Sequence, residues 1–143
     1  MIHTIRPMTA IAKLDKTDAL LRYNDAVGQK IQGAREVTPD DLGREFTKAG
    51  RTTDITLGKL TVLDMDGLPV GYDSGVLRFN DQLEFSGGPG RVFSQGGDSG
   101  SLILDRTGWA VGLLFAGGES NGEDFTYANR ILRVLEALGV QLA

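Results

Sequence analysis

The chain has no cysteine, and only one histidine and four prolines among its 143 residues. Without cysteine it cannot form disulfides, thiol nucleophiles or cysteine-ligated metal sites, and one histidine cannot build a histidine-rich site. We therefore expect no metal ion and no cofactor. Basic residues are outnumbered, 15 against 19 acidic ones, giving a net charge of -4. This balance argues against nucleic acid as a partner.

Long apolar runs are also missing. No apolar stretch approaches the roughly 18 residues of a membrane span, and residues 1–7 lack the apolar core of a signal peptide. The sequence therefore predicts no membrane partner and favours a cytoplasmic location. Glycine, in contrast, is abundant: its 20 residues are about twice the usual share. This excess indicates many tight turns, and hence β structure.

From Phe46 onward the sequence has the two-residue period of β strands. Apolar residues alternate through Val76–Phe85, and the apolar runs Ser101–Asp105 and Trp109–Phe115 are separated by a turn, which predicts a hairpin. Another strand is expected to bend or bulge at Gly58. Short strands with regular turns predict a mainly β fold, either a small antiparallel barrel or a sandwich.

The two ends of the chain have other patterns. Asn129 is expected to cap a C-terminal α-helix that stops at Gly139. Residues 1–45 are weakly patterned, with a short strand expected at Met8–Leu14 and one helical turn after Thr38. We divide the chain into 1–45, a linker with remnants of another packing unit, and 46–143, the β domain with its helix.

Residues 96–101, with the sequence Gly-Gly-Asp-Ser-Gly-Ser, are the strongest candidate for chemistry. Consecutive glycines leave backbone N–H groups uncovered, so Ser99 can present its hydroxyl to a carbonyl while the N–H groups of Gly97 and Ser99 converge on its oxygen. The alternative is a structural turn with an incidental serine. Ser101 replaces the second glycine of a hydrolase nucleophile elbow, and no lysine follows to complete a phosphate loop.

The stretch Gly97–Leu104 resembles the nucleophile segment of chymotrypsin/trypsin-like serine peptidases. In the family's order, Ala110–Gly117 resembles the strand along which substrate lies, and Phe125–Ala128 resembles the segment that closes the specificity pocket. Upstream, Lys48–Thr53 is similar to a stretch common in bacterial members. The resemblance covers about Phe46–Leu142 and implies the second, C-terminal barrel of a two-barrel fold.

The resemblance implies a role for each matching residue. Ser99 would be the nucleophile, Gly97 the main oxyanion-hole donor and Asp98 a structural carboxylate. The implied substrate-binding residues are Phe93, at the base of the specificity pocket, and Phe115, Ala116, Gly117 and Tyr127. An aromatic ring at the bottom of the specificity pocket would favour a small or apolar substrate side chain.

Two members of the catalytic triad have no match. Met8 stands where the orienting aspartate is expected, and His3 lies too close to it along the chain to match the family's general base. A triad needs a histidine to accept the serine proton and a carboxylate to fix its tautomer. We therefore expect this chain alone to be inactive. Residues 1–45 would be a remnant of the first barrel and the inter-barrel linker.

Three hypotheses follow. The first is a serine endopeptidase-like domain that acts on a peptide or protein, with His and Asp supplied by a missing barrel or another chain. The second is a catalytically inactive peptide-binding or interaction module. The third is an unrelated small β-barrel with a coincidental glycine-rich turn. Arg51, beside two threonines, is interpreted as stabilising a turn rather than binding an anion.

Overall fold

The computed structural model describes residue 28 and residues 30–142. The strand expected at Met8–Leu14, together with His3, lies outside the described residues. Within them, the single helical turn expected after Thr38 is confirmed as the 3-10 helix η1 (Pro39–Asp41), with Thr38 as its N-cap.

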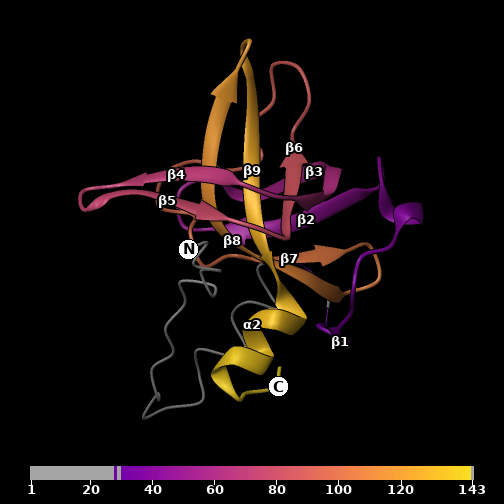
Figure 1. Ribbon diagram of the computed structural model, residues 1–143. Coiled ribbons are helices and arrows are strands. Elements are labelled where there is room, and N and C mark those ends of the chain that lie inside the picture. Colours follow the sequence, from indigo (N-terminus) through magenta and orange to yellow (C-terminus); the bar gives the residue numbers. More distant parts are fainter. Residues whose placement is uncertain (1–27, 29, 143) are drawn as a thin grey trace.

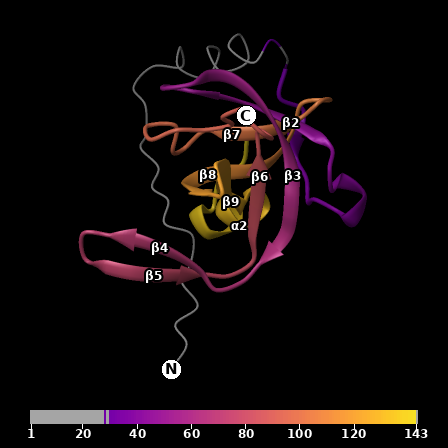
Figure 2. The same cartoon turned by 90° about the horizontal axis from the view of Figure 1, so that it is seen from above.

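Six antiparallel strands close into a barrel. Figure 2 looks into this barrel from above, and Figure 1 shows it from the side. In order around the ring they are β2 (Glu45–Gly50), β3 (Asp54–Met65), β6 (Gln82–Ser86), β9 (Glu123–Arg130), β8 (Trp109–Ser120) and β7 (Leu102–Asp105). The last strand, β7, pairs with the first, β2, which closes the ring. The short strand β1 (Gly33–Ala34) pairs with β8 in parallel. The fold is therefore mainly β, as the strand pattern predicts, and of the two architectures left open it is the closed antiparallel barrel that the resemblance implies.

A separate hairpin projects from the barrel, formed by β4 (Leu68–Tyr72) and β5 (Gly75–Phe79) (Figure 2). The prediction of one strand over Val76–Phe85 is therefore wrong, because β5 and β6 divide this segment between them. Asp81 has a left-handed φ of 59°, which interrupts the extended backbone. Phe79 and Phe85 are both fully buried on either side of the break.

The barrel core contains a row of aromatic rings. Phe46 and Phe85 meet edge to face at 5.4 Å, and Phe85 lies 5.7 Å from Phe93. A Cβ on Gly58 would lie 2.7 Å from the Phe93 ring. The glycine therefore makes room for Phe93, whereas the irregular register of β3 lies further along, between Leu60 and Met65. Of the bend or bulge expected at Gly58, the bulge is therefore not found there.

The helix α2 (Ile131–Leu138) follows β9 directly. Asn129 does not cap it, because β9 continues to pair with β6 and β8 through this residue, and Arg130 occupies the N-cap position. The helix ends at Gly139, in the left-handed conformation expected of a glycine C-cap. Ile131 and Val134 share a buried cluster with side chains of β7 and β8. No helix in the described part of the chain is long and apolar enough to cross a bilayer.

Candidate functional site

The turn that carries Ser99 connects the loop after β6 to strand β7. Ser99 is exposed, whereas Asp98 beside it is buried. The Ser101 hydroxyl donates to the Asp98 carbonyl at 2.6 Å, and the Gly100 N–H donates to the Leu114 carbonyl at 2.8 Å. Gly97 has a φ of 100°, a conformation that residues with a Cβ rarely adopt. The glycines thus allow the turn, and its own hydrogen bonds hold Ser99 at the surface.

The Asp98 carboxylate points away from solvent and ties the Ser99 turn to the turn between β2 and β3. Its Oδ1 accepts the N–H groups of Thr52 (2.7 Å) and Thr53 (3.2 Å). Its Oδ2 accepts the Thr53 hydroxyl (2.6 Å) and the Gln95 N–H (3.0 Å). Burial is the largest single influence on the pKa of Asp98 and acts to raise it, but the hydrogen bonds, led by that of Thr53, together hold the pKa well below its usual range.

Lys48 supplies a buried positive charge next to Asp98. Its side chain is fully enclosed, with Nζ 3.4 Å from Asp98 Oδ2. Nζ also donates to the Thr53 hydroxyl at 2.5 Å and lies 5.9 Å from the centre of the Phe93 ring. Burial lowers the pKa of Lys48, and the Asp98 charge opposes this shift. A fully buried ion pair therefore lies beneath the Ser99 turn.

Lys48 was not among the site residues predicted from the sequence. The sequence did hold a signal for its burial: successive side chains of a strand point to opposite faces, so Lys48 lies on the same inward face of β2 as Phe46. A lysine at an inward strand position requires a partner, since burying an unpaired charge is too costly. The partner, Asp98, lies 50 positions later in the chain, and only the fold shows that the two meet.

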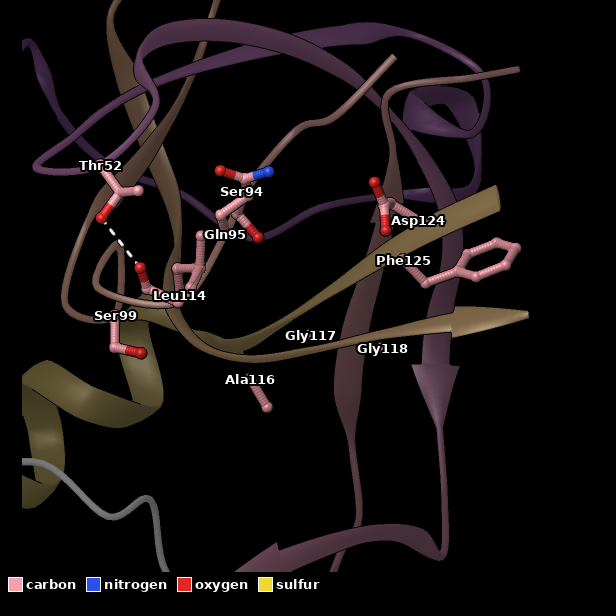
Figure 3. A pocket seen from close by; sticks show the side chains of 11 residues that line it. Thr52, Ser94, Gln95, Ser99, Leu114, Ala116, Gly117, Gly118, Asp124 and Phe125 are labelled. Atoms are coloured by element: carbon pink, nitrogen blue, oxygen red, sulfur yellow. Dashed lines mark hydrogen bonds between the residues drawn. The ribbon is translucent and has the colours of Figure 1, made fainter. Parts of the chain in front are cut away.

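A hollow of about 580 Å³ opens beside Ser99. Figure 3 shows Thr52 and Ser99 at one end, Asp124 and Phe125 at the other, and Ala116 and Gly117 between them. The remaining lining residues are Ser94, Gln95, Gly96, Leu114 and Gly118. The Ser94 hydroxyl shares a 2.6 Å hydrogen bond with the hydroxyl of buried Thr126. The hollow is therefore lined by neutral polar groups, by the apolar side chains of Leu114, Ala116 and Phe125, and by one carboxylate, that of Asp124.

The fold brings some of the expected site residues together at this hollow. Ser99, Ala116 and Gly117 line it, and Gly97 and Asp98 belong to the turn that presents Ser99. Three of these five come from the turn and two from β8, and β7 joins the two segments. The glycine-rich turn and the expected substrate strand thus lie at one place on the surface.

The three expected aromatic contacts lie elsewhere. Phe93 is fully buried in the barrel core, and its neighbour Ser94 lines the hollow in its place. Phe115 packs against Phe79 at 5.0 Å, because successive side chains of β8 point to opposite faces. Tyr127 lies next to Glu84, and burial together with that carboxylate raises the pKa of its hydroxyl. Phe93 therefore does not reach the hollow, and the aromatic side chain that lines it is Phe125, at the end away from Ser99.

No set of three or more His, Cys, Asp or Glu side chains is arranged to hold a metal ion within residues 28 and 30–142. The acidic segment 119–124 forms the ends of β8 and β9 and the tight turn between them. The chemistry of the hollow therefore depends on hydroxyl groups, backbone N–H groups and single charges.

Several solved structures share this architecture. A serine protease specific for glutamic acid is 23% identical with a TM-score of 0.61, and the match covers 80% of this chain and 55% of that one. Cellulomonas bogoriensis chymotrypsin is 25% identical with a TM-score of 0.57, over 81% and 57% of the two chains. Thermobifida fusca Protease A is 21% identical with a TM-score of 0.58, over 80% and 54%.

These neighbours are chymotrypsin/trypsin-like serine proteases, so the six-strand barrel has a trypsin-like fold. The chain spans about half the length of the structures it matches. No protein-family model matches the sequence, and no curated protein matches it either.

Proposed function

We propose that this chain is the serine-bearing, C-terminal barrel of a trypsin-like serine peptidase and that Ser99 is its nucleophile. One observation carries the proposal: Ser99 is exposed at the end of a hollow, on a turn fixed from below by the buried Asp98 and Lys48. The trypsin-like fold of the neighbours and the Gly-Asp-Ser-Gly sequence support it.

The proposed reaction is peptide-bond hydrolysis in two steps. Ser99 Oγ attacks the carbonyl carbon of the substrate and gives its proton to a general base, which returns it to the amine as the C–N bond breaks. Water then hydrolyses the acyl-serine ester and restores the hydroxyl. The N–H groups of Gly97 and Ser99 are the proposed donors to the oxyanion. Substrate backbone would follow Ala116 and Gly117.

The general base and its orienting carboxylate are proposed to come from a further segment of the protein or from a partner chain. The described residues contain no histidine, because His3 lies outside them. Without a base, a nucleophilic serine keeps only the part of catalysis that the oxyanion donors supply, on the order of 10³–10⁴ over water. The barrel by itself should therefore hydrolyse peptides negligibly.

The second candidate function is an inactive peptide-binding module. It is favoured by the fact that the chain's own contacts hold both the Ser99 turn and the hollow, including the hydrogen bond from the Thr52 hydroxyl to the Gly96 carbonyl. A surface so ordered can bind an extended peptide whether or not a base is present.

One experiment distinguishes the peptidase from the inactive module. The protein is purified from its natural source, treated with a fluorophosphonate, and analysed by peptide mapping. The peptidase predicts stoichiometric labelling at Ser99, and Ser99→Ala should abolish both labelling and turnover. Ser74→Ala, at an exposed turn between β4 and β5, is the matched control and should change neither. Peptide binding without labelling would establish the module instead, and the absence of both would leave only the fold.

A further inference from the structure

Arg51 lies against the Ser99 turn. It occupies the turn between β2 and β3, where the next two residues donate their N–H groups to Asp98. A Cβ placed on Gly97 would lie 3.2 Å from Arg51 Nη2 and 3.6 Å from its Nε. The guanidinium group is therefore in contact range of the residue two positions before Ser99.

This guanidinium group is exposed, and no described residue hydrogen-bonds to it or forms an ion pair with it. Arg35 and Arg130, in contrast, each contact at least two carboxylates. The turn around Arg51 is held instead by Asp98 and by the Thr52 hydroxyl. Arg51 therefore lies against the turn at Gly97, but no hydrogen bond or ion pair from a described residue occupies its guanidinium group.

The position of Arg51 relative to the hollow determines what it can bind. The hollow extends from Ser99 toward Asp124 and Phe125, whereas Thr52, next to Arg51, lies at the Ser99 end (Figure 3). On the proposed function, the acyl part of a substrate occupies the hollow. The leaving part of the peptide then departs past the Ser99 end, where the unpaired guanidinium lies.

We propose that Arg51 is a specificity-determining residue that binds a carboxylate on the leaving-group side of the substrate. The inference rests on the proposed function and adds a substrate class to it, namely peptides with Asp or Glu one or two residues after the bond at Ser99. A guanidinium group binds a carboxylate through two parallel hydrogen bonds, so the position of the acidic residue is selected as well as its charge.

A peptide panel with the Ser99→Ala protein tests this, since binding is measured without turnover. The probes are fluorescent octapeptides with an alanine-rich frame in which one Glu, Gln or Lys is moved through each position. Wild-type Arg51 should favour Glu over Gln by about two- to fivefold at one or two adjacent positions, as expected for an exposed ion pair. Arg51→Gln should remove this preference, and Arg51→Glu should transfer it to Lys.

Arg44→Gln is the matched control, because Arg44 is an exposed arginine at the opposite end of β2. It should leave the Glu preference intact. Peptide binding that is insensitive to charge at every position, or equally sensitive to Arg44→Gln and Arg51→Gln, would overturn the role of Arg51 and leave the proposed function standing. Binding of no peptide at all would overturn the peptide site itself, and the inference with it.

Discussion

Two clusters in this barrel pair a basic side chain with carboxylates, but they differ in how far water reaches them. Beneath the Ser99 turn, the side chains of Lys48 and Asp98 are both 0% exposed. At the start of α2, the Arg130 side chain is 9% exposed, but its partners Glu36, Asp64 and Asp81 are 47%, 66% and 36% exposed. One cluster is closed to water, and in the other water reaches every carboxylate.

The difference shows where a charge pair determines local structure. In the exposed cluster, water can replace a lost partner, so each pair contributes little. In the buried cluster, removing one partner leaves the other charged without a partner inside the protein, and the penalty is large. Lys48 and Asp98 therefore fix the Ser99 turn, whereas the Arg130 cluster ties together segments that the barrel already holds.

Lys48→Met should have the largest effect. The substitution keeps the side-chain volume but leaves the Asp98 carboxylate without a counter-charge, and breaking a buried pair costs about 3–5 kcal/mol. Urea unfolding of wild type and variant measures the loss. A loss below about 1 kcal/mol, the value typical of exposed pairs, would mean that water reaches Asp98 and that the two clusters do not differ.

Gly58→Ala should come next, because it disturbs the surroundings of the buried pair without changing a charge. The new Cβ would lie 2.7 Å from the Phe93 ring, which contacts Lys48 Nζ, and overpacking of this kind costs about 1–3 kcal/mol. Thermal unfolding measures it. Gly71→Ala, in β4, is the control, since its Cβ meets no atom within 4 Å. Equal losses for both variants would contradict the tight packing around Phe93.

Acid should weaken the buried cluster gradually. Because the pKa of Asp98 is held below its value of 3.8 in the unfolded chain, its contribution to stability is complete above about pH 4 and is lost as the pH falls toward the lower, folded pKa. The free energy of unfolding should therefore decline between pH 4 and 2. Asp98→Asn, already less stable, should show a flatter decline over the same range. Identical slopes would indicate that Asp98 titrates normally.

Arg130→Met should cost only about 1 kcal/mol, since the carboxylates it leaves are exposed to water. Added salt should reduce this cost further, because ions screen exposed charges. Unfolding in 0.1 M and 1 M NaCl measures both values. A loss as large as that of Lys48→Met would remove the distinction between the clusters and make the start of α2 an equal contributor.

Ser99→Ala should change stability least, by less than about 0.5 kcal/mol, as expected for an exposed side chain. The turn is held by Asp98, Ser101 and the Gly100 N–H rather than by the Ser99 hydroxyl. Chemical denaturation of the isolated chain measures it. A larger loss would show that the hydroxyl supports the turn, which would weaken the case for a chemical role.

Strand alternation was enough to predict a barrel or a sandwich, the family resemblance favoured the barrel, and glycine spacing was enough to predict the Ser99 turn. Alternation and glycine spacing are local signals: side chains of a half-buried strand alternate, and Gly97 must adopt a positive φ. The hairpin of β7 and β8 is confirmed for the same reason. The family resemblance implied Ala116 and Gly117 as substrate contacts, and this hairpin places them beside Ser99.

Features that depend on distant contacts could not be predicted. Asparagine is a common helix cap, but the pairing of β9 with β6 and β8 extends β9 through Asn129. Phe93 was placed by spacing from Ser99, yet the space beside Gly58 decides where its ring lies. The burial of Lys48 was not predicted, because its partner Asp98 is remote in sequence. In each case a tertiary contact outweighs a local preference.

On the proposed function, Ser99 is a nucleophile held in position by its turn, and it lacks only a general base. Fluorophosphonate labelling of the isolated chain with free imidazole as an added base tests it most directly. We expect slow labelling without imidazole, and a rate at Ser99 that rises with the concentration of neutral imidazole, while the other serines stay unlabelled. Rapid stoichiometric labelling without imidazole would contradict it by revealing a base in the chain, and unselective labelling with imidazole would contradict it by showing an unprepared serine.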